Sequence, residues 1–288
     1  EKLAELPRGV PVGIVAAPGM FAPEDAPSSS WSVCGADTIT VVAGKAPEPL
    51  PIDAAVLAAD DTREWVVTAE GRRLLPEANT PQGRVIRRAL GVTPDTPRWM
   101  PPTQVISALR ELPPAALPDP LPQIIDADDQ AWALADGRIQ PITGTQRTML
   151  LDAGAKAAVA SRESLASYPD AEEKLRLPGE RPRWVEPHLA CVDQDRGGAT
   201  VDEVPGGIEL SGTSVATHFA GLHGGSVGVD SGHGFHVVSG NGLRYRAPDA
   251  ETLATVGAAH VEDVPWEIIA LLPEGAELTR DAALQATY

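Results

Sequence analysis

The sequence predicts an α+β protein in which a central β core, clipped by a disulfide, is flanked by repeated lobes, each a β-hairpin with two short helices (ββαα). Three observations predict this class: a motif that recurs along the chain, two strand-rich blocks between the copies, and one cysteine in each block. Proline makes up 28 of 288 residues, about twice the usual share. Because proline ends helices, short elements are favoured over a long helical bundle.

The recurring motif begins with an alternating apolar run, a turn pair that ends in glycine, and a second short run. The turn pairs are Glu70-Gly71, Asp136-Gly137 and Asn241-Gly242. Asp-Gly and Asn-Gly between alternating runs are strong hairpin signals, because tight primed turns require a positive φ. The sequence therefore predicts a hairpin turn at each of Gly71, Gly137 and Gly242.

Each predicted hairpin is followed by apolar residues at helical spacing and then by a glycine stop, at Gly91, Gly154 or Gly257. A second short helix comes next, in PPTQVISALRELP, SRESLASYP and VPWEIIALLP. The opening EKLAELP matches the end of this unit, so we interpret it as the remnant of a further copy. We therefore expect the chain to be a fragment whose native amino-terminal part is missing.

A hairpin with two short helices buries little surface alone, so each lobe must pack on a neighbour or on a shared core. We expect the two strand-rich blocks to form one central sheet; two separate β-rich domains are the alternative. The predicted segments are residues 1–8 (remnant of repeat 1), 9–60 (first half of the core), 61–114 (repeat 2), 115–172 (repeat 3), 173–230 (second half of the core) and 231–288 (repeat 4 and the C-terminal tail).

Cys34 and Cys191 both lie in apolar, strand-like surroundings and without a CxxC spacing, which argues against a zinc knuckle or a redox motif. They are either two unrelated buried thiols or one disulfide that closes a long loop. We expect the disulfide, which the chain-entropy account makes stabilising by up to about 5 kcal/mol. A disulfide implies an oxidising, extracytoplasmic compartment.

The net charge of −17 comes from 40 acidic and 23 basic side chains. A chain this acidic is repelled by phosphate backbones and anionic headgroups, so nucleic acid is not an expected partner. No apolar run approaches the roughly 20 residues that span a bilayer.

Several phrases, in their order along the chain, match a known family: LPRGVPVGIVAAP, SSSWSVC, DGRIQPI, GLRY, and PWEIIALLP followed by LTRDAAL. By these phrases the chain resembles the EccB family, a core component of the type VII (ESX) secretion membrane complex of actinobacteria, over essentially its whole length. The resemblance implies an elongated, pseudo-twofold arrangement of a central core and four repeat lobes. It also implies a single-pass protein of the inner membrane, anchored by an amino-terminal transmembrane helix absent here, with this domain on the periplasmic side.

The function implied by the resemblance is structural, namely assembly and stabilisation of the secretion channel, with no cofactor. The implied partners are other EccB copies, the channel and ATPase subunits, and the mycosin protease. Two alternatives stay open. Some family members carry the label ATPase, and the family repeats resemble a cell-wall-binding module, which suggests contact with peptidoglycan by fold analogy.

Two stretches of the sequence resemble catalytic motifs. A P-loop requires GxxxxGK[ST], but Gly44-Lys45 has Ile39 at the first glycine position and Ala46 after the lysine. The phrases around Ser214, His223 and Asp230 resemble the segments of a subtilisin-like triad. The three residues occur here in the order Ser, His, Asp, however, which is the reverse of the order in that family, and they lie within one short Gly/Ser-rich stretch. We therefore predict no catalytic residues and interpret that stretch as turns between strands.

Histidine and acidic clusters are the candidate metal ligands. Four histidines cluster in one glycine-rich region, where no regular pairing sets a tetrahedral spacing, so loop imidazoles are favoured over a metal site. The acidic strings at 126–129 and 169–173 lack the alternating ligands and central glycine of a calcium loop, and we expect solvated loops or helix starts. The four histidines are His218, His223, His233 and His236.

Overall fold

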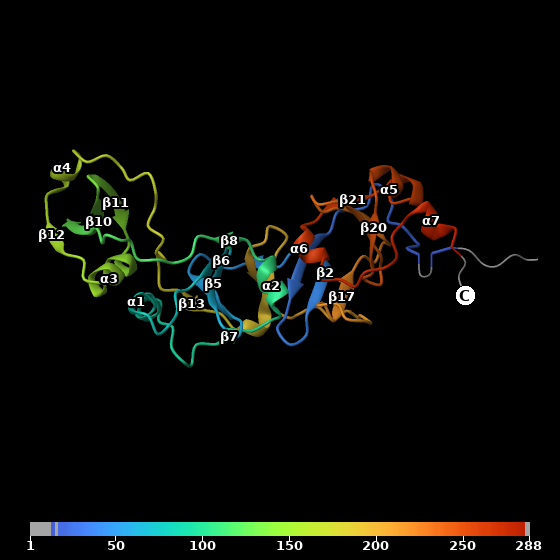
Figure 1. Ribbon diagram of the computed structural model, residues 1–288, viewed down its shortest axis with the longest axis horizontal. Helices are drawn as coiled ribbons and strands as arrows, with labels where there is room; N and C mark the ends of the chain where they lie inside the picture. Colours follow the sequence, from blue (N-terminus) through green and yellow to red (C-terminus); the bar gives the residue numbers. More distant parts are fainter. Residues whose placement is uncertain (1–12, 15–16, 286–288) are drawn as a thin grey trace, which may run out of the picture.

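The computed structural model describes residues 13–14 and 17–285 and contains four β-sheets. The sheets and their helices form an elongated row, with the yellow-green lobe at one end and the orange-red lobe at the other (Figure 1). We call the successive bodies lobe B (residues 123–171), lobe A (54–112), the central sheet, and lobe C (227–275). The predicted remnant at residues 1–8 lies outside the described residues.

The central sheet draws on both strand-rich blocks, which confirms the prediction of one core and makes the alternative of two separate domains wrong. Cys34 and Cys191 lie directly opposite each other on two of its antiparallel strands and form a disulfide with a Cα–Cα distance of 4.1 Å. The predicted disulfide is thus confirmed. The strand order is β16 (Ile208–Glu209), β17 (His218–Gly221), β2 (Thr40–Gly44), β1 (Ser30–Cys34), β14 (Ala190–Val192), β15 (Gly198–Thr200) and β3 (Glu48–Pro49).

Lobe A is built around three antiparallel strands, and β13 (Arg183–Trp184) adds a parallel strand from a distant part of the chain. Its own elements are β4 (Ala54–Ala59), β5 (Glu64–Thr68), β6 (Gly71–Leu74), α1 (Pro81–Ala89), β7 (Arg98–Trp99), α2 (Thr103–Ala108) and β8 (Glu111–Leu112).

Lobes B and C repeat the same chain path. Lobe B contains β9 (Gln123–Ala127), β10 (Gln130–Ala135), β11 (Arg138–Ile142), α3 (Gly144–Asp152), β12 (Ala157–Val159) and α4 (Arg162–Leu165). Lobe C contains β18 (Val227–Asp230), β19 (Phe235–Val238), β20 (Arg244–Ala247), α5 (Ala250–Val256), β21 (Val261–Asp263) and α6 (Trp266–Ile269). Outside the lobes lie the 3₁₀ helix η2 (Pro187–Leu189) and α7 (Arg280–Ala283).

The lobes are richer in strands than the predicted ββαα unit. In each lobe an extra strand precedes the hairpin, and a short strand after the first helix pairs with it in parallel, as β7 does with β4, β12 with β9, and β21 with β18. The chain after the second helix then pairs in parallel with the third strand, at Glu111, Asp170 and Glu274. The two- and three-residue strands are too short for alternation to reveal them.

Strand pairing also differs from the expected segments at three places, one of which is β13, expected in the second half of the core but paired with β4 of lobe A. β4, expected in the first half of the core, pairs with β5 of lobe A, and β18, expected in the second half, pairs with β19 of lobe C. β4 is buried along its whole length, so the alternation of a lobe strand is missing from its sequence. The pseudo-twofold arrangement stays a prediction.

The predicted helices are confirmed, and their ends follow from local chemistry. The side chains of Thr80, Thr143 and Asp249 accept hydrogen bonds from backbone N–H groups in the first turns of α1, α3 and α5. Gly91, Gly154 and Gly257 then take φ values of 69°, 102° and 92°, which glycine adopts without the steric cost of a Cβ.

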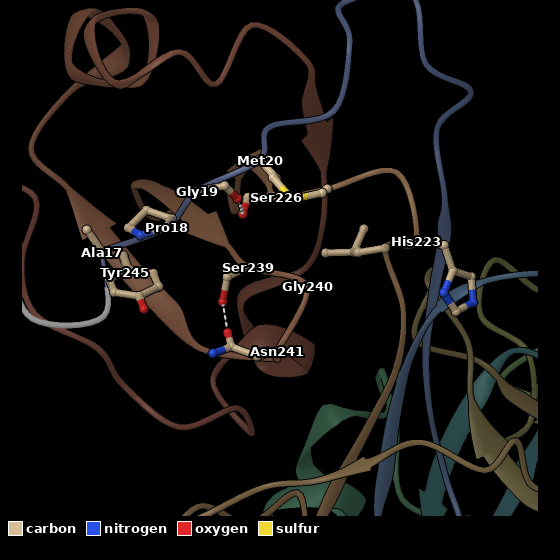
Figure 2. A pocket seen from close by; sticks show the side chains of 12 residues that line it. Ala17, Pro18, Gly19, Met20, His223, Ser226, Ser239, Gly240, Asn241 and Tyr245 are labelled. Atoms are coloured by element: carbon tan, nitrogen blue, oxygen red, sulfur yellow. Dashed lines mark hydrogen bonds between the residues drawn. The ribbon is translucent and has the colours of Figure 1, made fainter.

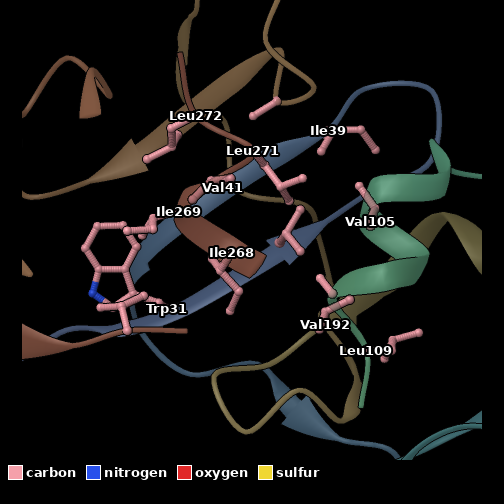
Figure 3. Close-up of a cluster of buried hydrophobic side chains, with 14 of the residues drawn as sticks. Trp31, Ile39, Val41, Val105, Leu109, Val192, Ile268, Ile269, Leu271 and Leu272 are labelled. Atoms are coloured by element: carbon pink, nitrogen blue, oxygen red, sulfur yellow. The ribbon is translucent and has the colours of Figure 1, made fainter. Parts of the chain in front are cut away.

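One large apolar cluster joins lobes A and C to the central sheet. Val105 and Leu109 of the α2 segment and Ile268 and Leu272 of the α6 segment pack with Trp31 and other strand residues (Figure 3). A second cluster joins lobe A to lobe B, with Ile86 of α1 near Met149 of α3. Within the residues described, none of the helices is long and apolar enough to cross a membrane.

Candidate functional site

A buried polar network lies where lobe C meets the central sheet. Glu262 of β21, 4% exposed, accepts hydrogen bonds from the Trp31 indole N–H (2.5 Å) and the Ser29 backbone N–H (2.8 Å). The His260 ring lies 3.1 Å from the same carboxylate. A buried carboxylate is tolerated when its oxygens are paired in this way. The network therefore fixes lobe C against β1.

The turn between β14 and β15, residues 193–197, continues this joint. The Gln194 side chain accepts from the Trp31 backbone N–H (3.0 Å) and donates to the Asp263 carbonyl of lobe C (2.8 Å). Arg196 donates to the Ala108 carbonyl at the end of α2 (2.9 Å) and forms an ion pair with Glu267 of α6 (2.8 Å). One turn thus holds lobe A and lobe C together.

Lobe A has its own buried contact with the central sheet. Trp99 of β7 is fully buried and its indole N–H donates to the Gly35 carbonyl (2.8 Å), next to the disulfide. The backbone N–H of Arg110 donates to the Arg196 carbonyl (2.7 Å), which brings the chain after α2 to the same turn. Both flanking lobes are therefore anchored by an indole hydrogen bond and by residues 193–197.

A charged cluster inside lobe A braces β5 against α1 and β7. Glu64 pairs with Arg87 of α1 and with Arg98 of β7, the latter at 2.7 Å. Burial raises the pKa of the Glu64 carboxyl, but the hydrogen bonds from Arg98 and Arg87 outweigh burial and leave that pKa below its ordinary value. Arg87 also donates to the Pro76 carbonyl (3.1 and 2.9 Å). The carboxylate is therefore ionised at neutral pH.

A cavity of about 300 Å³ lies between residues 17–20 and the turn of lobe C that contains Asn241 (Figure 2). Two hydroxyl groups of its lining are engaged with other lining residues: Ser226 donates to the Gly19 carbonyl (2.8 Å), and Ser239 donates to the Asn241 side chain. His223 borders it, and no carboxylate is among the described residues that line it. The cavity therefore lacks an acid to orient the imidazole.

The residues that imitate a protease triad are engaged separately. The Ser214 hydroxyl donates to the Ala216 carbonyl (2.8 Å), and the Asp230 carboxylate accepts from the Gly232 N–H (2.9 Å). His223 is exposed and forms no hydrogen bond with either side chain. The hydroxyl, imidazole and carboxylate are thus not connected as nucleophilic catalysis requires.

The other candidate residues are also dispersed. His218 lies 3.0 Å from Thr217 Oγ1, His233 is exposed, and His236 is buried on β19. Burial, followed by the nearby Arg244 charge, lowers the pKa of His236. In the described part of the chain no three His, Cys, Asp or Glu side chains gather as metal ligands would. Lys45 is exposed after the end of β2.

The first acidic string spans the end of β9 and the turn after it, and the second lies in the connection after α4. Asp126 at the end of β9 accepts two hydrogen bonds from Arg147 (2.8 Å each), which keeps the pKa of that carboxyl below its usual range. Asp128 and Asp129 make the turn between β9 and β10. In the second string, Glu172 pairs with Arg138 (2.8 Å) after the chain has bridged β11 at Asp170. Neither string begins a helix.

The three turn glycines share a positive φ, 137° at Gly71, 72° at Gly137 and 76° at Gly242. A Cβ on Gly71 would lie 2.3 Å from the Arg110 carbonyl, and one on Gly242 would lie 2.7 Å from Phe219 and Leu210. A Cβ on Gly137 would meet nothing within 4 Å. Two of the turns are thus packed against other segments and the turn of lobe B is open.

The sequence analysis did not identify Glu262, Gln194 and Arg196 as functional residues, because no periodic pattern in the sequence distinguishes them.

Comparison with known proteins agrees with this architecture. Residues 1–133 and 173–287 match the family model described as "Type VII secretion system ESX-1, transport TM domain B". The chain is 26% identical over 355 residues to "ESX-1 secretion system ATPase EccB1" of Mycobacterium tuberculosis (strain ATCC 25618 / H37Rv), with 98% of this chain and 71% of the relative covered. Identity to "ESX-5 secretion system ATPase EccB5" of the same strain is 26% over 369 residues, with the same coverage.

Solved structures show the same fold. The EccB3 dimer from the ESX-3 core complex matches with a TM-score of 0.77 and 20% identity, covering 99% of this chain and 89% of that one. The periplasmic assembly of the ESX-5 inner membrane complex matches with a TM-score of 0.71 and 22% identity, covering 99% and 85%. Since the family model spans most of the chain, the protein belongs to the EccB family of the type VII secretion system.

Proposed function

We propose that the chain is a periplasmic scaffold domain of a type VII secretion membrane complex. The observation that carries the proposal is that α2 of lobe A and α6 of lobe C pack on the central sheet in one apolar cluster. Together with the Glu262 network and the 193–197 turn, this makes a stiff, elongated body with long outer faces (Figure 1). Such a body suits the holding of several subunits at fixed spacing.

Copies of the same protein and other subunits of the complex are the proposed partners. Support comes from two structures of the same fold, one an EccB3 dimer and one a periplasmic assembly of an inner membrane complex. Among the other subunits we propose the channel, the ATPase and the mycosin protease, and we place this domain on the periplasmic side of an inner membrane protein. The disulfide between Cys34 and Cys191 supports an oxidising compartment.

The test is assembly of the membrane complex in cells that lack the protein and are complemented with variants. With the wild-type chain we expect intact complexes on native gels. With Ile268→Asp, which places a charge in the fully buried α6 contact, complexes should be lost although the membrane subunits are still made. Glu203→Asp, a change at an exposed residue, is the matched control. Complexes that assemble equally well without the protein would refute the scaffold role.

Two further assays test the alternative functions. These are ATP hydrolysis, suggested by the relatives' name ATPase, and binding to peptidoglycan, suggested by the fold analogy to a wall-binding module. Purified protein is assayed for phosphate release from ATP with magnesium, alongside Lys45→Ala as a control. It is also sedimented with insoluble peptidoglycan. The scaffold role predicts that Lys45→Ala supports full assembly. Turnover that disappears in Lys45→Ala, together with loss of assembly, would instead favour the enzyme.

A further inference from the structure

A hollow of about 450 Å³ on lobe A is unusual in this acidic molecule because arginines surround it. Its lining residues come from α1, from the loops before and after α1, and from the segment that returns from lobe B to the central sheet, about 90 residues further along the chain. No carboxylate is among the described residues that line it, although Glu77 and Glu180 neighbour lining residues in sequence. The lining residues are Ala78, Arg84, Arg87, Arg88, Gly91, Val92, Thr93 and Arg181.

Two of the four arginines are held in place by oxygen acceptors. Arg84 donates to the Asn79 carbonyl (2.7 Å), and Arg87 donates to the Pro76 carbonyl and pairs with Glu64. Their guanidinium groups are therefore fixed at the wall of the hollow, and less side-chain entropy is lost when a ligand binds.

The other two arginines have unused hydrogen-bonding capacity. Arg88 and Arg181 are exposed, and neither forms an ion pair or a side-chain hydrogen bond with a described residue. Arg88 has a partial explanation without a ligand, because a cation in the last turn of a helix complements the helix dipole. Arg181 has no such explanation, since it lies outside the helices and strands.

The backbone at Gly91 defines where the Arg181 guanidinium lies. A Cβ added at Gly91 would lie 2.4 Å from Arg181 Nε and 2.5 Å from its Nη2, so the guanidinium lies directly against the glycine backbone. Gly91 also has a φ of 69°. The glycine that ends α1 therefore leaves the space in which Arg181 faces the arginines of α1.

We propose that this hollow binds a phosphate-bearing anion. Guanidinium groups match phosphate oxygens with paired, charge-assisted hydrogen bonds, and a phosphate group carries more charge than one carboxylate. With Glu64 shared between Arg87 and Arg98, the positive charges of Arg84, Arg88 and Arg181 remain to be balanced. The volume lies in the range of small-ligand sites, about 300–1,000 Å³. The site is independent of the proposed scaffold role.

The experiment is a calorimetric titration of the whole chain with inorganic pyrophosphate at low ionic strength, together with flotation on vesicles. The double variant Arg88→Gln/Arg181→Gln removes two exposed charges without removing a side-chain hydrogen bond or ion pair between described residues, and Arg246→Gln, an exposed arginine of lobe C, is its matched control. We expect pyrophosphate to bind the wild type, about tenfold or more weaker binding in the double variant, and no change in the control. Added salt should weaken the binding, because exposed charges are screened.

The vesicle arm distinguishes a lipid headgroup from a free phosphate. Vesicles of phosphatidylglycerol are compared with vesicles of phosphatidylcholine, using the same three proteins. Binding to phosphatidylglycerol vesicles alone, lost in the double variant, supports the site and assigns the phosphate to a headgroup. Binding to pyrophosphate alone assigns it to a soluble ligand. The proposal is overturned if neither probe binds, or if the double variant binds as tightly as the wild type.

Discussion

Lobes A and C differ from lobe B in how their second helix is used, although the three lobes share one chain path. The α2 and α6 helices bury Val105 and Ile106, and Ile268 and Ile269, in the cluster that covers the central sheet. In α4 the buried residue is Leu165, which packs inside lobe B. The α6 segment, EIIALL, has enough apolar residues to cover the central sheet and to close its own lobe. The α4 segment, RESLAS, has enough only to close its own lobe. The apolarity of one short helix therefore determines where a lobe attaches.

Removing the disulfide should have the largest effect and should separate the central sheet from lobe B. Cys34→Ala/Cys191→Ala opens a loop of 157 residues and should lower the free energy of unfolding of the central sheet by about 3–5 kcal/mol. Hydrogen exchange in β9 to β11 should be unchanged, since these strands pack on lobe A and on a cluster inside lobe B and not on the central sheet. The reduced wild type is the control. An equal loss of protection in both regions would show that they unfold as one unit.

Truncation of a second helix tests the comparison directly. Ile268→Ala, at a fully buried residue, should cost about 3 kcal/mol and increase hydrogen exchange in β1 and β2, because the cavity lies on the central sheet. Leu165→Ala should cost less and change exchange in lobe B alone. If Leu165→Ala also increases exchange in β1 and β2, lobe B is coupled to the sheet and the distinction is wrong.

The Glu262 network gives a smaller effect that is confined to the joint of lobe C. Glu262→Ala leaves the Trp31 indole N–H and the Ser29 N–H without their acceptor and should cost about 2–3 kcal/mol. Chemical denaturation followed by tryptophan fluorescence measures this cost, and Trp31 is one of the six tryptophans that contribute to the signal. Glu203→Ala, at an exposed position, should stay within about 0.5 kcal/mol of the wild type. Equal stabilities of the two variants would count against the anchoring role.

The smallest effect concerns Glu64 and depends on pH. The folded-state pKa of Glu64 lies below the ordinary value of 4.5, so its stabilisation is present above that value and is lost as the pH falls through the folded-state pKa. Glu64→Gln should therefore cost about 1–2 kcal/mol at neutral pH, and the difference from the wild type should shrink below pH 4.5. Glu48→Gln, in the exposed strand β3, is the matched control. A pH-independent cost would mean that the carboxylate charge is not involved.

Features encoded by local chemistry could be predicted from the sequence. The turn pairs, the glycine stops and the amphipathic second helices each depend on residues close together in the chain, and the sequence predicts these helices correctly. The disulfide is also predicted correctly, although its cysteines are 157 residues apart. Strands as short as Arg98–Trp99 or Val261–Asp263 were not found, because they are fixed by a neighbouring strand and have no period of their own. Glu262 was missed for the same reason, since its partners Trp31 and Ser29 lie more than 200 residues away.

The position of the disulfide has a consequence for limited proteolysis. Cys34 and Cys191 close a loop that contains lobe A, lobe B and the return segment with the exposed Arg176 and Arg181. A single backbone cut anywhere in that loop leaves two pieces that are still covalently joined through sulfur. Nicked and intact molecules therefore have almost the same mass until a reductant is added, and only then do the two fragments separate.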